Sequence, residues 1–310
     1  MWILKNSQIL TDILDTQGQM KYSHVSTWDF STLYTSIPHK DLIDRLSKLI
    51  ISVFTKTGHQ YINVRSHKAF SSSKTYRGYH VWDVSMFVEL LEFLIDNIYV
   101  KFGSKLHKQH IGIPMGTNCA PLLADLYLFT YEYDYMQSLI KGKDLQKAKS
   151  FNFTFRYIDD LVSVQNKYIK DAVKDIYPPT LELKETTDSP DGTSYLDLYL
   201  FKDKNGFISR RLYDKRDDYN FTIVNYPFLD SNIPEGPAYG TYTSRLVAFA
   251  RACQNLCDFN QRHKSLIMKL GCQGYNIKRL HSTFLKFGFK YKEIISKYNT
   301  CVDSLWKSIL

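Results

Sequence analysis

The amino-acid sequence predicts an α+β domain over residues 1–228, followed by a basic, helical domain over residues 240–310. Three observations support this division. Strand-like and helix-like apolar patterns alternate through the first part of the chain. A Pro- and Gly-rich stretch, 233-IPEGPAYG-240, then interrupts these patterns. Beyond it the apolar spacing is helical throughout, and Lys and Arg become dense. We therefore predict a domain boundary near residues 228–240.

The first elements follow from local patterns. We expect a short strand over residues 22–30, which ends beside an acidic residue. A helix is predicted to begin near Pro38, because proline favours the first helical turn. Its apolar face comprises Leu42, Leu46, Leu49 and Ile50. Residues 56–80 are polar and rich in Ser, Lys and His, so we interpret them as a surface insertion. Apolar side chains at helical spacing predict another helix over residues 83–98.

The middle of the chain alternates between strands and helices. Residues 98–112 alternate in polarity around Gly103-Ser104, which indicates a β-hairpin. A long helix is predicted from Asn118 to about Ile140. The two segments that flank Lys204-Asn205-Gly206 are typical of a second hairpin. The remaining predicted elements are strands at 151–158, 161–165, 180–186, 194–201 and 207–213, and a helix at 167–176.

Composition narrows the class of protein. The chain has 310 residues, of which 44% are apolar and 15% aromatic, and this composition is typical of a globular protein. Lys and Arg outnumber Asp and Glu by 40 to 31, which gives a net charge of +9. A basic excess that clusters on one domain is typical of a polyanion partner.

The cysteines and the apolar runs bear on the cellular location of the protein. Five cysteines at irregular spacing argue against a disulfide framework. We see neither a signal peptide nor an apolar run that approaches the roughly 20 residues of a membrane helix. We therefore expect an intracellular protein, with the nucleus as the favoured location and no membrane partner. Zinc binding is an alternative for Cys253, Cys257, His263 and Cys272, but their spacing fits no common finger and buried thiols are favoured.

Two adjacent acids, Asp159 and Asp160, interrupt the apolar run 156-RYIDDLVSV-164. At a tight turn between two strands, both carboxylates can reach one edge of a sheet. So close together they would raise one another's pKa, unless a divalent cation holds both as anions. Mg²⁺ is the natural candidate, and Asp29, at the end of the first strand, is the best third acid. Such a site can hold two metal ions about 3.5–4 Å apart for phosphoryl transfer.

Three sequence motifs, in their order along the chain, resemble those of the reverse-transcriptase palm. The residues in and around them are most similar to those of Penelope-like and related retroelement enzymes. The first motif, Asp followed five residues later by Tyr or Phe, is Asp29 and Tyr34. The second is 113-IPMGTNCAP-121, and the third, an aromatic residue, any residue and two aspartates, is 157-YIDD-160. The resemblance covers about residues 25–225 and extends, less specifically, through the basic helices.

The resemblance implies a fold and an activity. It implies a palm, an antiparallel sheet with helices packed on one face, over residues 1–228, and a thumb-like domain over 240–310. The implied function is that of an RNA-directed DNA polymerase from a retrotransposon. Such a nucleotidyltransferase adds dNTPs to a primer 3′-hydroxyl with two Mg²⁺ ions, for which Mn²⁺ is an alternative. The implied partners are an RNA template, a DNA primer and dNTPs.

The resemblance also assigns roles to residues of the palm. Asp29, Asp159 and Asp160 become catalytic acids, and they hold the metal ions together with Phe30. Tyr34 would exclude a 2′-hydroxyl, and the dNTP would also contact Pro114, Met115 and Gly116. Lys184 would be the general acid for pyrophosphate release. Simpler roles remain open: Asp29 as a helix N-cap, Tyr34 as a core residue, the Gly-Pro segment as loop punctuation, and Lys184 as a solvated lysine.

The basic helices are predicted to grip nucleic acid through phosphate contacts. The residues concerned are Arg245, Arg251, Arg262, Lys264, Lys269, Lys278 and Arg279. A solvated basic face is the alternative interpretation of these side chains.

One departure from the family pattern sets a rival hypothesis. Only 28 residues precede Asp29, fewer than the fingers region that contacts the triphosphate in reverse transcriptases. We therefore expect an N-terminally truncated enzyme without fingers, and without the nuclease that many Penelope-like elements append. The rival is a catalytically incomplete nucleic-acid-binding remnant or a domesticated retroelement protein. Both hypotheses predict salt-sensitive RNA–DNA binding, and metal-dependent dNTP addition separates them.

Overall fold

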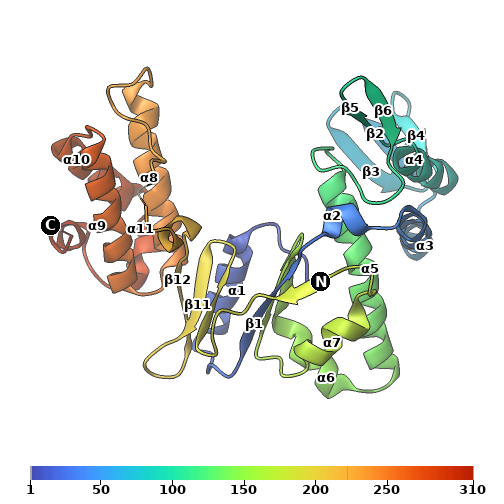
Figure 1. Cartoon of the computed structure of the whole chain (residues 1–310), viewed down its shortest axis with the longest axis horizontal. Coiled ribbons are helices and arrows are strands. Elements are labelled where there is room, and N and C mark those ends of the chain that lie inside the picture. The colour runs from blue at the N-terminus through green and yellow to red at the C-terminus, as the bar shows by residue number, and fades with distance from the viewer. Residues whose placement is uncertain (1, 222, 310) are drawn as a thin grey trace. The chain divides into compact units, whose positions relative to one another are not determined.

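The computed structural model describes residues 2–221 and 223–309 and divides into two compact units (Figure 1). The first unit comprises residues 2 and 3 with Trp28–Glu185. The second comprises Leu4–Thr27 and the chain from Thr186 onward. The predicted boundary at 228–240 does not coincide with this division, because it falls inside the second unit.

A four-stranded sheet forms the centre of the first unit, in the order β7-β8-β1-β9. Its strands are β7 (Thr154–Tyr157), β8 (Asp160–Val164), β1 (Val25–Phe30) and β9 (Leu183–Glu185). β7 pairs with β8, and β1 with β9, in antiparallel register. Five of the six residues of the central strand β1 are buried, as expected for a strand with neighbours on both sides.

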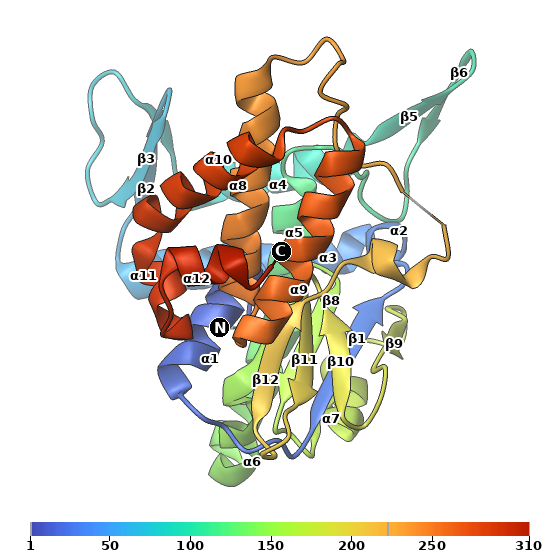
Figure 2. The ribbon, with the colours of Figure 1, turned by 90° about the vertical axis from the view of Figure 1, so that its left-hand side faces the viewer.

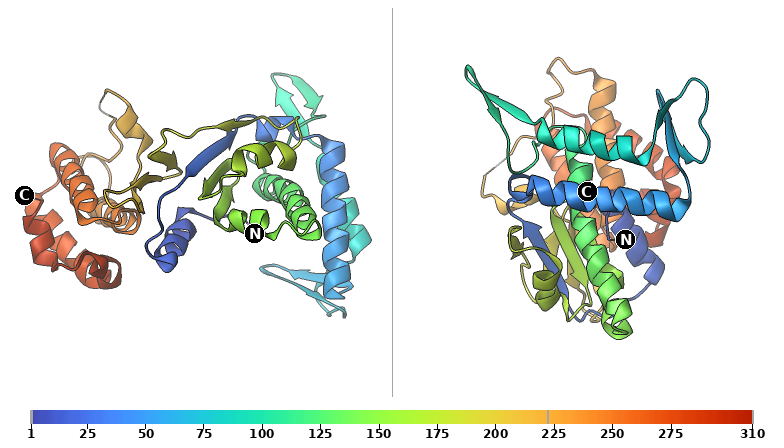
Figure 3. Two further views of the ribbon diagram at one scale, coloured as in Figure 1. Left: turned by 90° about the horizontal axis from the view of Figure 1, so that it is seen from below. Right: turned by 90° about the vertical axis from the view of Figure 1, so that its right-hand side faces the viewer.

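Helices α5 (Ala120–Lys141) and α7 (Ile169–Ile176) share one hydrophobic core with this sheet. The sheet contributes Trp28, Phe30 and Leu161 to the core, and the Phe30 ring meets Tyr177 edge-on at 4.9 Å between centroids. Helices α3 (His39–Thr57) and α4 (Val84–Asp96) pack against each other, and α3 also contacts α5 (Figure 3). The predicted helices in these positions are therefore confirmed.

Short elements complete the helical layer of this unit. They are α2 (Leu33–Ser36), α6 (Leu145–Ser150) and the single 3₁₀ turn η1 (Phe151–Phe153). The predicted strand at 151–158 is therefore shorter than expected, because its first three residues form η1.

The polar segment 56–80 forms a small antiparallel sheet in the order β3-β2-β4. Its strands are β2 (Tyr61–Arg65), β3 (Lys68–Ser72) and β4 (His80–Trp82). Asn63 is fully buried there, and its side chain accepts from the Tyr76 N–H at 3.1 Å and donates to the Lys74 carbonyl at 3.1 Å. The sequence predicted only a surface insertion here, because nothing in the polar composition of the segment distinguishes Asn63, which is buried and hydrogen-bonded, from its exposed polar neighbours.

The predicted hairpin at 98–112 is confirmed as β5 (Tyr99–Phe102) and β6 (Lys105–Lys108). These two strands pair only with each other. Figure 2 shows the hairpin extending away from α4 as a free ribbon.

The second unit joins helix α1 (Ser7–Gln17) to the C-terminal half of the chain. Its sheet has the order β10-β11-β12, formed by β10 (Gly192–Tyr195), β11 (Leu198–Lys202) and β12 (Ile208–Leu212). The Ile208 N–H donates to the Met20 carbonyl at 2.8 Å, and Arg210 pairs with Asp15 at 2.7 Å. These contacts place residues 4–27 with this unit, although the sequence argument had assigned them to the first domain.

The predicted strand at 194–201 is broken in two. Tyr195 pairs with Leu198, so Leu196 and Asp197 form a two-residue turn between β10 and β11. Leu196 adopts a positive φ of 53° there. The break was not visible in the sequence because leucine is an uncommon residue at such a position.

The remaining elements of the second unit are helical, as predicted for residues 240–310, but the 3₁₀ element at Lys215–Asp218 was not predicted and the first long helix begins at Glu235, inside the Pro- and Gly-rich stretch. They are η2 (Lys215–Asp218), α8 (Glu235–Ala252), α9 (Leu256–Cys272), α10 (Ile277–Lys290), α11 (Lys292–Ile295), η3 (Ser296–Tyr298) and α12 (Val302–Lys307). None of the helices in the described part of the chain is long and apolar enough to cross a membrane.

His263 lies in the aromatic core of this helical bundle. It is fully buried, its Nε2 lies 2.6 Å from the Tyr242 hydroxyl, and its ring stacks on Phe284 at 4.8 Å. Burial lowers the pKa of His263 to about 3, so the ring is neutral at physiological pH. Cys253 is buried, whereas Cys257 and Cys272 are exposed. His263 therefore acts here as a core residue.

Acid is expected to destabilise this unit through His263. An unfolded histidine has a pKa of about 6.5, so between pH 6.5 and 3 the unfolded chain binds more protons than the folded one. Stability should therefore fall as pH decreases through this window, by up to about 1.4 kcal/mol per pH unit. Urea unfolding between pH 4 and 7 measures this slope. The Tyr242→Phe/His263→Phe variant should lack this contribution, and an unchanged slope would contradict the assignment.

Candidate active site

The predicted acids come together at one end of the four-stranded sheet. Asp29 is the fifth residue of β1, and Asp160 is the first residue of the neighbouring strand β8. Tyr157 pairs with Asp160, so Ile158 and Asp159 form a two-residue turn between β7 and β8. The Phe30 N–H donates to the Asp159 carbonyl at 3.2 Å, which fixes this turn beside the end of β1.

No group of three or more His, Cys, Asp or Glu side chains within residues 2–221 and 223–309 is arranged to hold a metal ion. The donor types nevertheless suit Mg²⁺, since aspartate carboxylates and a main-chain carbonyl at Phe30 are hard oxygen ligands. The site thus offers suitable donors from adjacent strands without a closed ligand cage.

Tyr34, in helix α2, faces the same acids. Partial burial raises the pKa of its hydroxyl, and the negative charges of Asp159 and Asp125 raise it further. The hydroxyl is therefore protonated at neutral pH. The charges of Asp159 and Asp125 thus both act on the Tyr34 hydroxyl, and Asp125 was not among the predicted site residues.

The loop before α5 is locked to the segment around Tyr34 through the main chain. The Ile113 N–H donates to the Tyr34 carbonyl at 2.7 Å, and the Gly112 N–H donates to the Ile37 carbonyl at 2.7 Å. His39 Nε2 also lies 2.6 Å from the Gly112 carbonyl oxygen. The first and second motifs therefore form one rigid substructure.

Gly112 and Gly116 owe their conformations to different surroundings. Gly112 has a φ of +80°, and an added Cβ would lie 2.5 Å from the Tyr34 carbonyl oxygen. The backbone that approaches Gly112 so closely therefore belongs to the chain itself and not to a substrate. At Gly116, with φ +105°, an added Cβ would meet open space. The neighbouring Met115 is 74% exposed, so this end of the loop is accessible.

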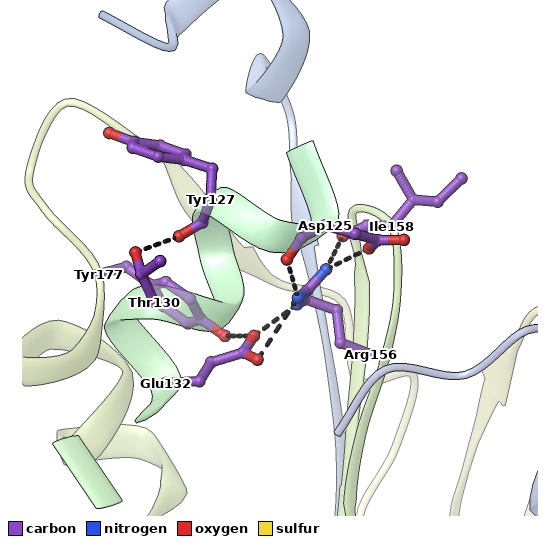
Figure 4. Close-up of polar contacts among 7 residues, drawn as sticks. All are labelled: Asp125, Tyr127, Thr130, Glu132, Arg156, Ile158 and Tyr177. Atoms are coloured by element: carbon purple, nitrogen blue, oxygen red, sulfur yellow. Dashed lines mark hydrogen bonds and ion pairs between the residues drawn. The ribbon is translucent and has the colours of Figure 1, made fainter. Parts of the chain in front are cut away.

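The turn that carries Asp159 contains a strained residue. Ile158 adopts a φ of 53°, which is unusual for a β-branched side chain and costs on the order of 1–2 kcal/mol. Its carbonyl accepts a hydrogen bond from Arg156 Nη1 at 2.8 Å (Figure 4). The arginine thus holds the strained turn from inside the sheet.

Arg156 is completely buried and pairs with two carboxylates of α5. Its Nη1 lies 2.7 Å from Asp125 Oδ1, and its Nε lies 2.5 Å from Glu132 Oε1. The Tyr177 hydroxyl donates to the same Glu132 oxygen at 3.0 Å. Burial opposes the charge of Arg156, but the two carboxylates outweigh it and the pKa of the guanidinium is raised. This network fixes the 158–159 turn relative to α5.

This network was not predicted from the sequence. A signal was present, because an arginine inside an apolar strand must find acidic partners when it is buried. Asp125 and Glu132 stand seven residues apart, which places them on one face of the predicted long helix. That face is the one turned toward the sheet.

Lys184 lies directly opposite Asp29 in the β1–β9 pair. Residues that oppose each other in an antiparallel pair direct their side chains to the same face. The Lys184 ammonium pairs with Glu182 at 3.1 Å, and both side chains are more than half exposed. Lys184, the predicted general acid, is therefore in register with Asp29, and its ammonium group pairs at the surface with Glu182.

The predicted nucleic-acid-binding residues fall into two groups. Arg245, Arg262 and Arg279 form ion pairs inside the second unit, with Asp214, Asp217 and Glu235 respectively. The others are exposed and form no ion pair within the described chain: Arg251, Lys264, Lys269 and Lys278. Of the seven predicted residues, only these four have a charge that no carboxylate of the described residues compensates.

Removing Arg156 is expected to destabilise the first unit strongly. Arg156→Met would leave the Glu132 carboxylate buried without its cation, and breaking such a pair costs about 3–5 kcal/mol. Lys170→Met is the matched control, since it breaks the exposed 3.3 Å pair with Glu185 and should cost less than about 1 kcal/mol. Urea unfolding measures both variants. Equal losses of unfolding free energy in the two variants would show that the buried network stabilises the protein no more than an exposed ion pair does.

A methyl group at Gly112 is expected to disrupt the loop. Gly112→Ala adds both left-handed strain and a contact at 2.5 Å with Tyr34, so we expect it to cost over about 2 kcal/mol. In Gly58→Ala, the φ is +66° but no atom lies within 4 Å of the new methyl group. This control should cost about 1 kcal/mol. Thermal unfolding compares the two, and a similar loss at both positions would contradict the close approach.

The similarity of this chain to known proteins lies in its structure and not in its sequence. No protein-family model matches the chain, and no curated protein matches its sequence. The solved structure of telomerase from Candida albicans, in complex with a TWJ fragment of telomeric RNA, matches with a TM-score of 0.55 and 13% identity. The match covers 99% of this chain and 52% of that chain. Apo telomerase from Candida tropicalis gives a TM-score of 0.47 and 11% identity, over 100% and 53% of the two chains.

The Candida albicans match shows the fold. Telomerase is a reverse transcriptase, so the chain has a reverse-transcriptase-like fold, as the three motifs predicted. The chain spans about half the length of the telomerase chains that it matches. The resemblance to Penelope-like elements in particular stays a prediction.

Proposed function

We propose that this chain is the RNA-directed DNA polymerase domain of a retrotransposable element, similar to Penelope-like enzymes. One observation carries the proposal: Asp29 and the Asp159-Asp160 pair stand at the same end of adjacent strands in a reverse-transcriptase-like fold. Adjacent carboxylates at a sheet edge are the arrangement that two-metal phosphoryl transfer requires. The palm is assigned to residues 1–228 and the thumb to residues 240–310.

The acids and the Phe30 carbonyl would hold two Mg²⁺ ions, with Mn²⁺ as a substitute. Asp29 and Asp159 are the main ligands in this proposal, and Asp160 assists them. When bound, the metal pair supplies a lowered pKa at the primer 3′-hydroxyl and stabilises the negative charge of the leaving pyrophosphate. The chain itself supplies the aspartate side chains and a turn whose Ile158 carbonyl accepts a hydrogen bond from Arg156.

Other residues of the site select and orient the nucleotide. Tyr34 stands beside Asp159, where its ring would pack against C2′ of the sugar and exclude a 2′-hydroxyl. The accessible loop of Pro114, Met115 and Gly116 would lie against the incoming dNTP. Lys184, opposite Asp29, is placed to donate a proton to the leaving pyrophosphate.

An RNA template and a DNA primer are the proposed partners. The matched Candida albicans telomerase was solved with an RNA fragment, which supports a nucleic-acid partner for this fold. Four exposed cations of the second unit suit phosphate contacts: Arg251, Lys264, Lys269 and Lys278. The other three predicted contacts, Arg245, Arg262 and Arg279, would have to exchange an internal carboxylate for a phosphate.

A second candidate is a catalytically incomplete nucleic-acid-binding remnant, or a domesticated retroelement protein. One observation favours it. The described residues form no closed metal-binding group of His, Cys, Asp or Glu side chains. Under this hypothesis the palm and the basic helices bind nucleic acid without adding nucleotides.

Primer extension separates the two candidates. A labelled DNA primer on an RNA template should be extended with dNTPs and Mg²⁺ by the unchanged chain. Extension should fall to background in Asp159→Ala/Asp160→Ala, because the metal ligands are lost. Asp171→Asn removes an exposed carboxylate on α7 and is the matched control, which should extend normally.

The outcome that overturns the polymerase proposal is equally definite. If the unchanged chain extends no primer while it retains tight, salt-dependent binding to the RNA–DNA duplex, it is a binding protein and not an enzyme. If the double variant extends as well as the unchanged chain, the acids do not form the active site.

A further inference from the structure

The β5–β6 hairpin is exposed along both of its strands. All eight residues of its two strands are exposed, including Phe102 at 82% and Leu106 at 67%. Within residues 2–221 and 223–309 its strands have no third partner, and an isolated two-stranded hairpin is marginally stable in water. Large apolar side chains in such a place indicate that a partner covers them.

The charge of the hairpin indicates which kind of partner. Residues 97–124 contain no acidic residue, whereas the hairpin carries Lys101, Lys105 and Lys108. None of these lysines forms an ion pair with a carboxylate of residues 2–221 or 223–309. The hairpin is therefore a local concentration of uncompensated positive charge, complementary to a polyanion.

The register places apolar and basic side chains together on each face. Lys101 pairs with Leu106, and Phe102 pairs with Lys105. Since paired residues share a face, each face presents a lysine beside a large apolar group. Ammonium groups that contact phosphates, next to rings on which bases stack, are the combination that binds single-stranded nucleic acid.

The basic surface continues at the base of the hairpin. A cavity of about 510 Å³ is lined there by Lys108 and His110, together with Lys40 from the first turn of α3. Asp44 and Asp96 also line this cavity, so its charge is mixed and the uncompensated charge is concentrated on the hairpin. A nucleic-acid strand bound along the hairpin could continue into this cavity.

We propose that the β5–β6 hairpin binds a single strand of nucleic acid that passes around it, with Phe102 stacked on a base and Lys105 on a phosphate at one face, and Lys101 and Lys108 on phosphates at the opposite face. The choice of partner rests on the proposed function, which requires a template strand. The hairpin is distinct from the acids of the site and from the basic helices, so it adds a contact that neither supplies.

Fluorescence anisotropy with labelled 20-nucleotide RNA and DNA tests the proposal on the full chain. Lys101→Gln/Lys105→Gln/Lys108→Gln should weaken binding at least about tenfold and reduce the slope of log K against log salt by about 2. The control triple Lys141→Gln/Lys149→Gln/Lys174→Gln removes exposed lysines of α5, α6 and α7. It should bind as the unchanged chain does. The two oligonucleotides show whether RNA or DNA is preferred.

Phe102→Ser separates stacking from charge. It should weaken binding about tenfold without changing the salt slope, because a base loses its aromatic platform while the phosphate contacts remain. If the hairpin triple and Phe102→Ser both bind like the control triple, the proposal is overturned, and the apolar side chains are left to a protein partner.

Lysine acetylation gives a measurement that requires no substitution. A bound oligonucleotide should protect Lys101, Lys105 and Lys108 in the unchanged chain while Lys141 stays reactive, and equal reactivity with and without oligonucleotide would overturn the proposal. Failure of primer extension would leave these binding results untouched. The inference and the polymerase proposal can therefore fail separately.

Discussion

The buried guanidinium of Arg156 is the interaction on which the candidate site depends. Taking a charge out of water is costly, so Arg156 is stable inside the sheet only while Asp125 and Glu132 accompany it. Both acids belong to α5, and the same guanidinium holds the Ile158 carbonyl. One side chain thus sets the distance between the long helix, strand β7 and the turn that carries Asp159. A weaker hydrogen bond to the Ile158 carbonyl would allow the strained turn to relax.

A second constraint joins the other two motifs without any side-chain charge. The Gly112 segment lies so close to Tyr34 and Thr35 that a single methyl group would not fit. Tyr34 is thereby held at a fixed position beside Asp159 by main-chain hydrogen bonds. The aromatic residue of the first motif and the loop of the second are consequently parts of one structure, although about 80 residues separate them.

The positions of the unpaired basic residues say more about polyanion binding than the net charge of the chain does. The second unit is dense in Lys and Arg, yet Arg245, Arg262 and Arg279 are paired within it. The β5–β6 hairpin has fewer cations but leaves all three of its lysines without an ion-pair partner in the described chain. The accessible charge, and not the number of basic residues, determines where a polyanion can bind.

The sequence by itself determined the local elements and the order of the motifs. The spacing of apolar residues predicted α3, α4 and α5, and Gly103-Ser104 predicted the β5–β6 hairpin, because these features depend on neighbours within a few residues. The three motifs indicated a reverse-transcriptase fold. Only the tertiary structure decided that Arg156 meets Asp125 and Glu132, that α1 belongs with the C-terminal half, and that Gly112 faces Tyr34. Those contacts join residues far apart in the chain, and no local periodicity encodes which distant partner a buried charge or a glycine will meet.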